Sequence, residues 1–278
     1  MKKINRRSFL AAAGLTAAAL ALTACGGSAS STASSTASSA ASSEAASTSA
    51  AAELTTVEAG KLTMATNAAF PPYEMTTDAG EFEGIDIDTA KAIAEKLGLE
   101  LQIDDMDFDA ALLSVQQGKA DIGMAGVTVT DERKAVMDFS DSYATGIQSI
   151  IVPEGSDITS PDDLAGKKIG TQRGTTGYIY CSDDFGDDAV VAYDDGLTAV
   201  QALNNGQVDA VVIDNAPAKE FVAANPGLVI LDTSYAEEDY AIGLAKGSAL
   251  EDAVNAALEE LKADGTLQSI VDKYITAE

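Results

Sequence analysis

The chain has 278 residues, enough for one large domain or two domains of ordinary size. It carries 17 Lys and Arg against 44 Asp and Glu, and it contains no His. The absence of basic clusters argues against nucleic-acid binding and against electrostatic adhesion to anionic lipid. The absence of His excludes Ser-His-Asp and Cys-His catalytic arrangements and His-ligated metal sites. Neither a cofactor nor a metal ion is expected.

Residues 1–24 have the pattern of an export signal. Four basic residues precede an apolar run, Phe9 to Ala21, that is too short for a comfortable membrane span. The segment Arg6 to Leu10 resembles a twin-arginine signal, although general secretory signals also carry paired Arg. The segment Leu22 to Cys25 resembles the lipobox of bacterial lipoproteins, which implies cleavage before Cys25 and lipidation of its sulfur. The alternative is an incidental Cys beside a cleavage site.

Residues 25–53 are almost entirely Ser, Ala, Thr and Gly. The segment has too few large apolar side chains to offset the entropy of ordering the chain, so it is interpreted as a flexible tether. The folded part is expected to begin near residue 54.

From there the chain alternates between strand-like and helix-like segments. Strands are expected at 61–66, 99–103, 121–125, 147–152, 168–171, 208–214, 228–231 and 240–244. The first helix is expected from about 85 to 97, capped by Asp86 or Asp88 and ended by Gly98. A further helix is expected after Ser160. The other helices are expected at 108–117, 132–137, 197–203, 216–224, 250–263 and 267–274. This alternation predicts an α/β fold with largely parallel sheets. The segments 117–122 and 205–210 resemble each other, which suggests two similar sheets facing a shared cleft.

Four loops follow predicted strand ends, at 67–73, 126–133, 172–177 and 214–215. Thr130 can cap the helix that follows, but Arg133 then places a cation in the first turn, against the helix dipole. Such a break of a local rule is typical of a functional residue, and a guanidinium can hold a carboxylate by two hydrogen bonds. The alternative is a surface Arg paired with Asp131 or Glu132.

Two further kinds of side chain in these loops suit a free amino acid. Asp214 can face an ammonium group, or it can cap the helix near Pro217. Phe70 and Phe108 can form an apolar wall, or they can belong to the core. A cation, an acid and an apolar surface together match the carboxylate, ammonium and side chain of an α-amino acid.

Six motifs in order resemble those of the family 3 extracellular solute-binding proteins, the amino-acid-binding components of ABC importers. They are the segments 70–74, 84–88, 125–133, 138–140, 164–170 and 208–214. The resemblance covers about residues 61 to 274. It implies a type II periplasmic-binding-protein-like α/β fold with two lobes joined by two crossover strands: lobe 1 at 54–143 and 241–278, lobe 2 at 144–240.

The same resemblance implies the roles of individual residues. Arg133 would bind the ligand carboxylate, with backbone N–H groups near Thr128 and Thr176, while Asp214, the Gly126 carbonyl and the Thr128 hydroxyl would hold the ammonium. The ligand side chain would contact Asn67, Phe70, Phe108 and Gln172. Members that take cationic amino acids often have an acid at the position of Asn67, so Asn here suggests a neutral or polar ligand.

The lipobox implies a protein anchored by its lipid to the outer face of the bacterial cell membrane, and the resemblance implies ABC permease subunits as partners. The protein is expected to be a monomer and not an enzyme. Cys181 has no partner if Cys25 is lipidated, so it is expected to be a half-buried or free thiol. The alternatives are a dehydratase-type enzyme on the same scaffold, which the lack of His and of an acid/base pair disfavours, and a ligand-sensing domain.

Overall fold

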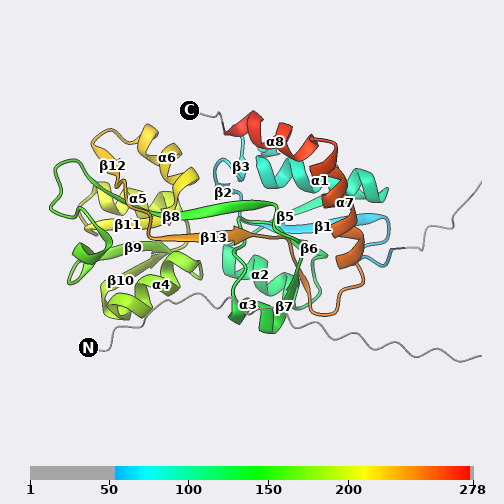
Figure 1. The fold of residues 1–278 in the computed structure, drawn as a ribbon, viewed down its shortest axis with the longest axis horizontal. Coiled ribbons are helices and arrows are strands. Elements are labelled where there is room, and N and C mark those ends of the chain that lie inside the picture. Colours follow the sequence, from blue (N-terminus) through cyan, green and yellow to red (C-terminus); the bar gives the residue numbers. More distant parts are fainter. Residues whose placement is uncertain (1–53, 276–278) are drawn as a thin grey trace, which may run out of the picture. The chain divides into compact units, whose positions relative to one another are not determined.

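The computed structural model describes residues 54–275, which fall within one compact unit, Ala50–Glu278. The predicted export signal, the predicted lipidation of Cys25 and the predicted tether up to residue 53 lie outside the described residues. The described part has two larger β-sheets, both covered by helices, and a small antiparallel sheet (Figure 1). Within residues 54–275 no helix is long and apolar enough to cross a membrane.

The first sheet has five strands in the order β5-β1-β6-β14-β7. These strands are β1 (Lys61–Thr66), β5 (Glu100–Asp105), β6 (Ile122–Gly123), β7 (Met137–Phe139) and β14 (Gly243–Ala245). Because successive side chains of a strand point to opposite faces, Leu62 and Met64 of β1 pack into one apolar cluster and Ala65 packs into another.

Helices fill the two sides of this sheet. The cluster around Leu62 and Met64 contains residues of α1 (Ile85–Leu97), α7 (Glu251–Ala263) and α8 (Thr266–Tyr274). The cluster around Ala65 contains residues of α2 (Phe108–Gln116). The short α3 (Asp131–Val136) precedes β7, and the small sheet consists of β2 (Ala69–Phe70), β3 (Glu74–Thr76) and β4 (Phe82–Glu83).

The second sheet has the order β10-β9-β11-β8-β12, with β13 also paired to β8. Its strands are β8 (Ala144–Pro153), β9 (Ile169–Gln172), β10 (Val190–Tyr193), β11 (Ala210–Asp214), β12 (Leu228–Ile230) and β13 (Ala236–Tyr240). Its helices are α4 (Thr176–Phe185), α5 (Gly196–Asn204) and α6 (Asn215–Ala224), with 3-10 turns η1 (Pro161–Leu164) and η2 (Asp187–Ala189). Alternation along β11 again separates two clusters: Val211 packs with α5 and α6, and Val212 packs with α4.

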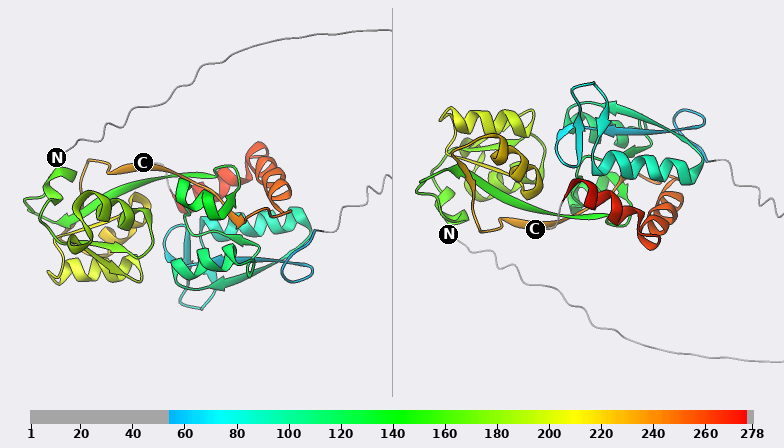
Figure 2. Two further views of the ribbon diagram at one scale, coloured as in Figure 1. Left: turned by 90° about the horizontal axis from the view of Figure 1, so that it is seen from below. Right: turned by 90° about the horizontal axis from the view of Figure 1, so that it is seen from above.

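Two long strands connect the part of the fold around the first sheet to the part around the second. The chain leaves the first sheet after β7 and enters β8, and it returns from β13 to β14. β8 and β13 pair antiparallel from Ala144 opposite Tyr240 to Gln148 opposite Ala236. Figure 2 shows this pair, in green and orange, running along one side of the molecule in both views.

The prediction of largely parallel sheets is wrong in part. β1 is parallel to β5 and β6, and β9 is parallel to β10 and β11. However, β14 is antiparallel to both of its neighbours, and β8 is antiparallel to all three of its partners. The reversed strands are those next to the two connections between the sheets, so both sheets are mixed. The predicted strand 240–244 is split for the same reason, because Tyr240 pairs in the second sheet and Gly243 in the first.

The predicted start of the first helix also needs correction. Neither Asp86 nor Asp88 caps it; Gly84 occupies the N-cap position, with φ 132°. A Cβ at Gly84 would collide with the carbonyl oxygen of Tyr73. Asp86 lies inside the first turn and is fully buried, where it accepts hydrogen bonds from the Gly126 N–H (3.0 Å) and the Tyr143 hydroxyl (2.7 Å). The predicted end at Gly98, in the left-handed conformation, is confirmed.

Other differences are smaller. The helix predicted after Ser160 is the single 3-10 turn η1, which has a capping box formed by Ser160 and Asp163. The strands β2, β3, β4, β7 and β10 had not been predicted, nor had the part of β13 before Tyr240. Cys181 is a free thiol and is fully buried rather than half-buried, and burial raises its pKa to about 12.

Candidate ligand-binding site

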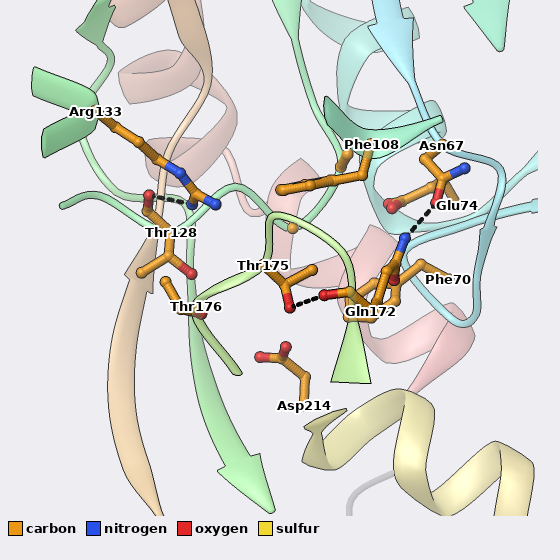
Figure 3. A pocket seen from close by; sticks show the side chains of 12 residues that line it. Asn67, Phe70, Glu74, Phe108, Thr128, Arg133, Gln172, Thr175, Thr176 and Asp214 are labelled. Atoms are coloured by element: carbon orange, nitrogen blue, oxygen red, sulfur yellow. Dashed lines mark hydrogen bonds between the residues drawn. The ribbon is translucent and has the colours of Figure 1, made fainter. Parts of the chain in front are cut away.

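A cavity of about 310 Å³, counted with the space at its mouth, lies where strand ends of the two larger sheets meet. Its lining includes all nine sequence-predicted binding residues: Asn67, Phe70, Phe108, Gly126, Thr128, Arg133, Gln172, Thr176 and Asp214. Glu74, Ala125 and Thr175, which had not been predicted, complete the lining (Figure 3). The structure thus brings together every residue of the predicted set; their roles toward a ligand stay a prediction.

The strand ends explain why distant residues meet here. Asn67 follows β1, and the segment from Ala125 to Thr128 follows β6, so both lie at the carboxyl end of the first sheet. Gln172 ends β9 and Asp214 ends β11 in the second sheet. In parallel α/β sheets ligands bind at the carboxyl ends of strands, where loops and helix N-termini are exposed to the crevice.

Arg133 lies in the first turn of α3 but is not a surface side chain. The hydroxyl of Thr130 accepts from the Arg133 N–H at 3.2 Å, so the predicted N-cap is confirmed. Arg133 is 8% exposed; its Nη1 donates to the Thr128 carbonyl at 2.8 Å and its Nη2 to the Gly174 carbonyl at 3.1 Å. Its central carbon lies 5.3 Å from the centroid of the Phe108 ring. The predicted alternative, a surface Arg paired with Asp131 or Glu132, is therefore wrong.

Asp214 occupies the N-cap position of α6, but its side chain makes no capping hydrogen bond. Its carboxylate instead accepts from Gln148 Nε2 at 2.7 Å and from the Tyr240 hydroxyl. Burial raises the pKa of Asp214 to about 7; these two hydrogen bonds oppose the shift and the nearby charge of Glu238 adds to it. Both of these donors are neutral side chains, and Asp214 lines the cavity as an acid.

Several hydrogen bonds join the two sheets across the cavity. Gln172 Nε2 donates to Asn67 Oδ1 at 2.8 Å, and the bond from Arg133 to the Gly174 carbonyl makes a second link. Figure 3 shows Arg133 on one side of the pocket, with Asn67 and Glu74 on the opposite side. The arrangement thus holds a cation at one end and polar oxygen atoms at the other.

Comparison with known proteins identifies the family. Residues 62–277 match the bacterial extracellular solute-binding proteins, family 3. The chain belongs to this family. It is 32% identical to a probable histidine-binding protein of Neisseria gonorrhoeae, over 99% of this chain and 98% of that protein. It is also 32% identical to the L-cystine-binding protein TcyJ of Escherichia coli (strain K12), over 80% of this chain and 85% of that protein.

Solved structures extend the comparison to the fold of this family 3 protein. The arginine-, lysine-, histidine-binding protein ArtJ from Geobacillus stearothermophilus superposes with a TM-score of 0.75 at 35% identity, covering 78% of this chain and 96% of that one. An ancestral arginine-binding protein bound to glutamine gives 0.75 at 42% identity, covering 78% and 99%. The predicted type II periplasmic-binding-protein fold is confirmed. The family is extracellular, which agrees with the predicted export.

Sequence reasoning missed Glu238, which is 6% exposed on β13 of this family 3 protein. Its Oε2 accepts from the hydroxyls of Thr128 (3.1 Å) and Thr176 (2.9 Å) and from Gln148 Nε2 (3.0 Å). The sequence of residues 236–240 gives no signal for it, because Glu237, Glu238 and Asp239 are all acidic, and only the structure shows that Glu238 is buried while its two neighbours are exposed. The two threonine hydroxyls therefore donate to an acid that the six motifs do not include.

The raised pKa of Asp214 predicts how stability depends on pH. An unfolded Asp has a pKa near about 3.9, so between about pH 4 and about pH 7 the folded state binds more protons than the unfolded state. Stability should therefore fall as the pH rises through this window. In urea unfolding of the ligand-free protein, the stability lost between about pH 5 and about pH 7.5 should be smaller in Asp214→Asn than in wild type, by more than about 1 kcal/mol.

The exposed Asp183 provides the control, since Asp183→Asn removes the same charge and should leave the pH dependence of wild type unchanged. Parallel pH profiles for wild type and Asp214→Asn would show that Asp214 is ionised in the folded protein throughout this range.

Proposed function

We propose that this protein is the substrate-binding component of an ABC importer and captures a free amino acid outside the cell. The observation that carries the proposal is the buried pair of opposite charges in one cavity, Arg133 and Asp214, which are not paired with each other. Arg133 binds the ligand carboxylate, together with backbone N–H groups near Thr128 and Thr176. Asp214, the Gly126 carbonyl and the Thr128 hydroxyl hold the ammonium group.

The remaining cavity residues contact the ligand side chain. These are Asn67, Phe70, Phe108 and Gln172. The predicted preference for a neutral or polar side chain rests on Asn67 alone, and relatives in this family are named for binding histidine, cystine, arginine and glutamine. They are named as binding proteins, which supports a binding function rather than the dehydratase or sensor alternatives.

We further propose two lobes, residues 54–143 with 241–278 and residues 144–240, that close on the ligand about β8 and β13 as a hinge. The positions of the two sheets support these boundaries, because the chain passes between the sheets near residues 143 and 241. The protein acts as a monomer, held to the outer face of the cell membrane by lipid on Cys25, and the permease subunits recognise the closed form.

Thermal unfolding of the purified protein with each free amino acid, and with sugars and short peptides as controls, tests the proposal. Carried-over ligand is first removed by unfolding and refolding. A ligand present at about 100 times its Kd should stabilise the protein by about 2.7 kcal/mol, a shift in Tm of several degrees. No shift with any amino acid would contradict amino-acid binding and would favour an assay for dehydratase activity.

A further inference from the structure

Glu238 is a buried acid of β13 for which the proposed function gives no role. The cavity lining includes Thr128, Thr176 and Asp214 but not Glu238, so this acid can act on a ligand only through the side chains in front of it. Glu238 is 6% exposed. Its Oε2 accepts from the Thr128 hydroxyl at 3.1 Å, the Thr176 hydroxyl at 2.9 Å and Gln148 Nε2 at 3.0 Å. One carboxylate oxygen thus orders three polar side chains at the cavity wall.

The bond to Thr128 decides what the Thr128 hydroxyl can offer to the cavity. A threonine hydroxyl has one proton to donate and two lone pairs that accept. Thr128 gives its proton to Glu238, so towards the cavity its oxygen can only accept. An ammonium group has only donors, so a hydroxyl held in this way is complementary to it. Without the acid, the hydroxyl would be free to turn its proton towards the ammonium group.

Gln148 connects the same acid to Asp214. Its Nε2 donates to Asp214 at 2.7 Å and to Glu238 at 3.0 Å, and the side chain is 1% exposed. The reversed amide would point its oxygen at two acids, so the hydrogen bonds fix its orientation. Asp214 and Thr128 are the two side chains proposed to hold the ligand ammonium group. They therefore belong to one buried hydrogen-bonded network that passes through Gln148 and Glu238.

We propose that Glu238 is a positioning residue, which turns the Thr128 hydroxyl into an acceptor for the ammonium group of the ligand. This inference rests on the proposed function. Thr128 follows β6 of the first sheet and Thr176 begins α4 beside the second sheet, whereas Glu238 lies on a strand that connects the two. Figure 3 shows both threonines on the Arg133 side of the pocket. Because the hydroxyl is already turned, binding need not reorient it, and such preorganisation increases affinity.

Isothermal titration of purified variants tests the role of Glu238. The probe is whichever of histidine, cystine, arginine and glutamine, the amino acids for which relatives are named, binds wild type most tightly. Glu238→Met keeps the length of the side chain but removes the acceptor, and it should raise the Kd of the probe about 10- to 100-fold. Glu238→Gln keeps one oxygen that can accept from the hydroxyl, so its Kd should rise less, about 3- to 10-fold.

Glu237→Met is the matched control. Glu237 is the neighbouring acid on the opposite, exposed face of β13, so this variant makes the same chemical change away from the cavity. Its Kd for the probe should stay within about twofold of the wild-type Kd. Circular dichroism melts establish that each variant is folded.

Thr128→Val decides whether Glu238 acts through this hydroxyl, because Val has nearly the shape of Thr and no proton to orient. In the Thr128→Val background, Glu238→Met should raise the Kd by less than about threefold, since two changes to one interaction are not additive. A purely structural role of Glu238 would give the same loss in both backgrounds. If Glu238→Met does not fold, the loss caused by Glu238→Gln in the two backgrounds decides.

Equal losses with and without the Thr128 hydroxyl would therefore overturn the positioning role. An unchanged Kd in folded Glu238→Met would overturn it as well, and either result would leave the proposed function intact. Wild type that binds none of the four probes, and no other amino acid in thermal unfolding, would instead contradict the proposed function.

Discussion

Replacing Arg133 with Ala is expected to weaken amino-acid binding by about 2–5 kcal/mol, which is roughly 30-fold to several thousand-fold in Kd. The guanidinium is buried and already held by the Thr128 and Gly174 carbonyls, so it is preorganised for a carboxylate. Ala would leave the ligand carboxylate without a cation in a cavity that contains buried acids. Isothermal titration with the amino acid found by thermal unfolding measures the loss.

Arg133→Lys is the control for charge alone. Lys keeps the positive charge but cannot make two parallel hydrogen bonds, so its affinity should lie between those of wild type and Arg133→Ala. The Kd of folded Arg133→Ala could instead stay within about twofold of the wild-type Kd. That result would show that the ligand carboxylate is bound elsewhere, because losing a buried ionic partner must weaken binding.

Replacing Gly146 with Ala is expected to destabilise the protein by about 2–4 kcal/mol, a fall in Tm of several degrees. Gly146 lies on β8, and a Cβ there would collide with the ring and hydroxyl of Tyr240 on β13. Tyr240 is fully buried and donates to Asp214, so moving its ring would disturb core packing and a hydrogen bond at the cavity together. Urea unfolding gives the loss of stability, and titration should show weaker ligand binding.

Two comparisons test whether Tyr240 is the cause. Gly170→Ala, on β9, places the new methyl group 3.2 Å from side-chain carbons of Val208 and Val211, which need to move only a few tenths of an ångström, so its effect should be smaller. Gly146→Ala should also cost less in a Tyr240→Leu background, because the collision is removed. Equal costs in both backgrounds would assign the effect to the strand and not to Tyr240.

The alternation of segments was sufficient to predict the fold class and most elements, because apolar periodicity and Gly at helix ends are local signals. The internal similarity between 117–122 and 205–210 was also informative. Asp121 accepts from the Thr63 N–H at 2.8 Å, and Asp209 accepts from the Lys168 N–H at 2.7 Å. Each Asp thus fixes a neighbouring strand of its own sheet, so the similar sequences have similar structural roles.

The acids of the site were harder to predict because their environment depends on distant residues. Asp86 has the local pattern of a helix cap, yet its position in the core follows from contacts with Gly126 and Tyr143. Glu238 contacts Thr128, 110 residues earlier in the chain, and no pattern within either segment indicates that pair. The mixed direction of the strands likewise depends on where the chain crosses between sheets, which local periodicity does not reveal.

The position of β14 in the first sheet has a consequence for the order in which the chain can fold. β14 is the last strand in sequence, yet it lies between β6 and β7. A chain that emerges N-terminus first therefore has β7 without a partner in this sheet until residue 245 is available. All strands of the second sheet lie between residues 144 and 240, so that sheet has its full set of strands earlier. The part of the molecule that begins first in sequence is thus the last whose strand pairing can be completed.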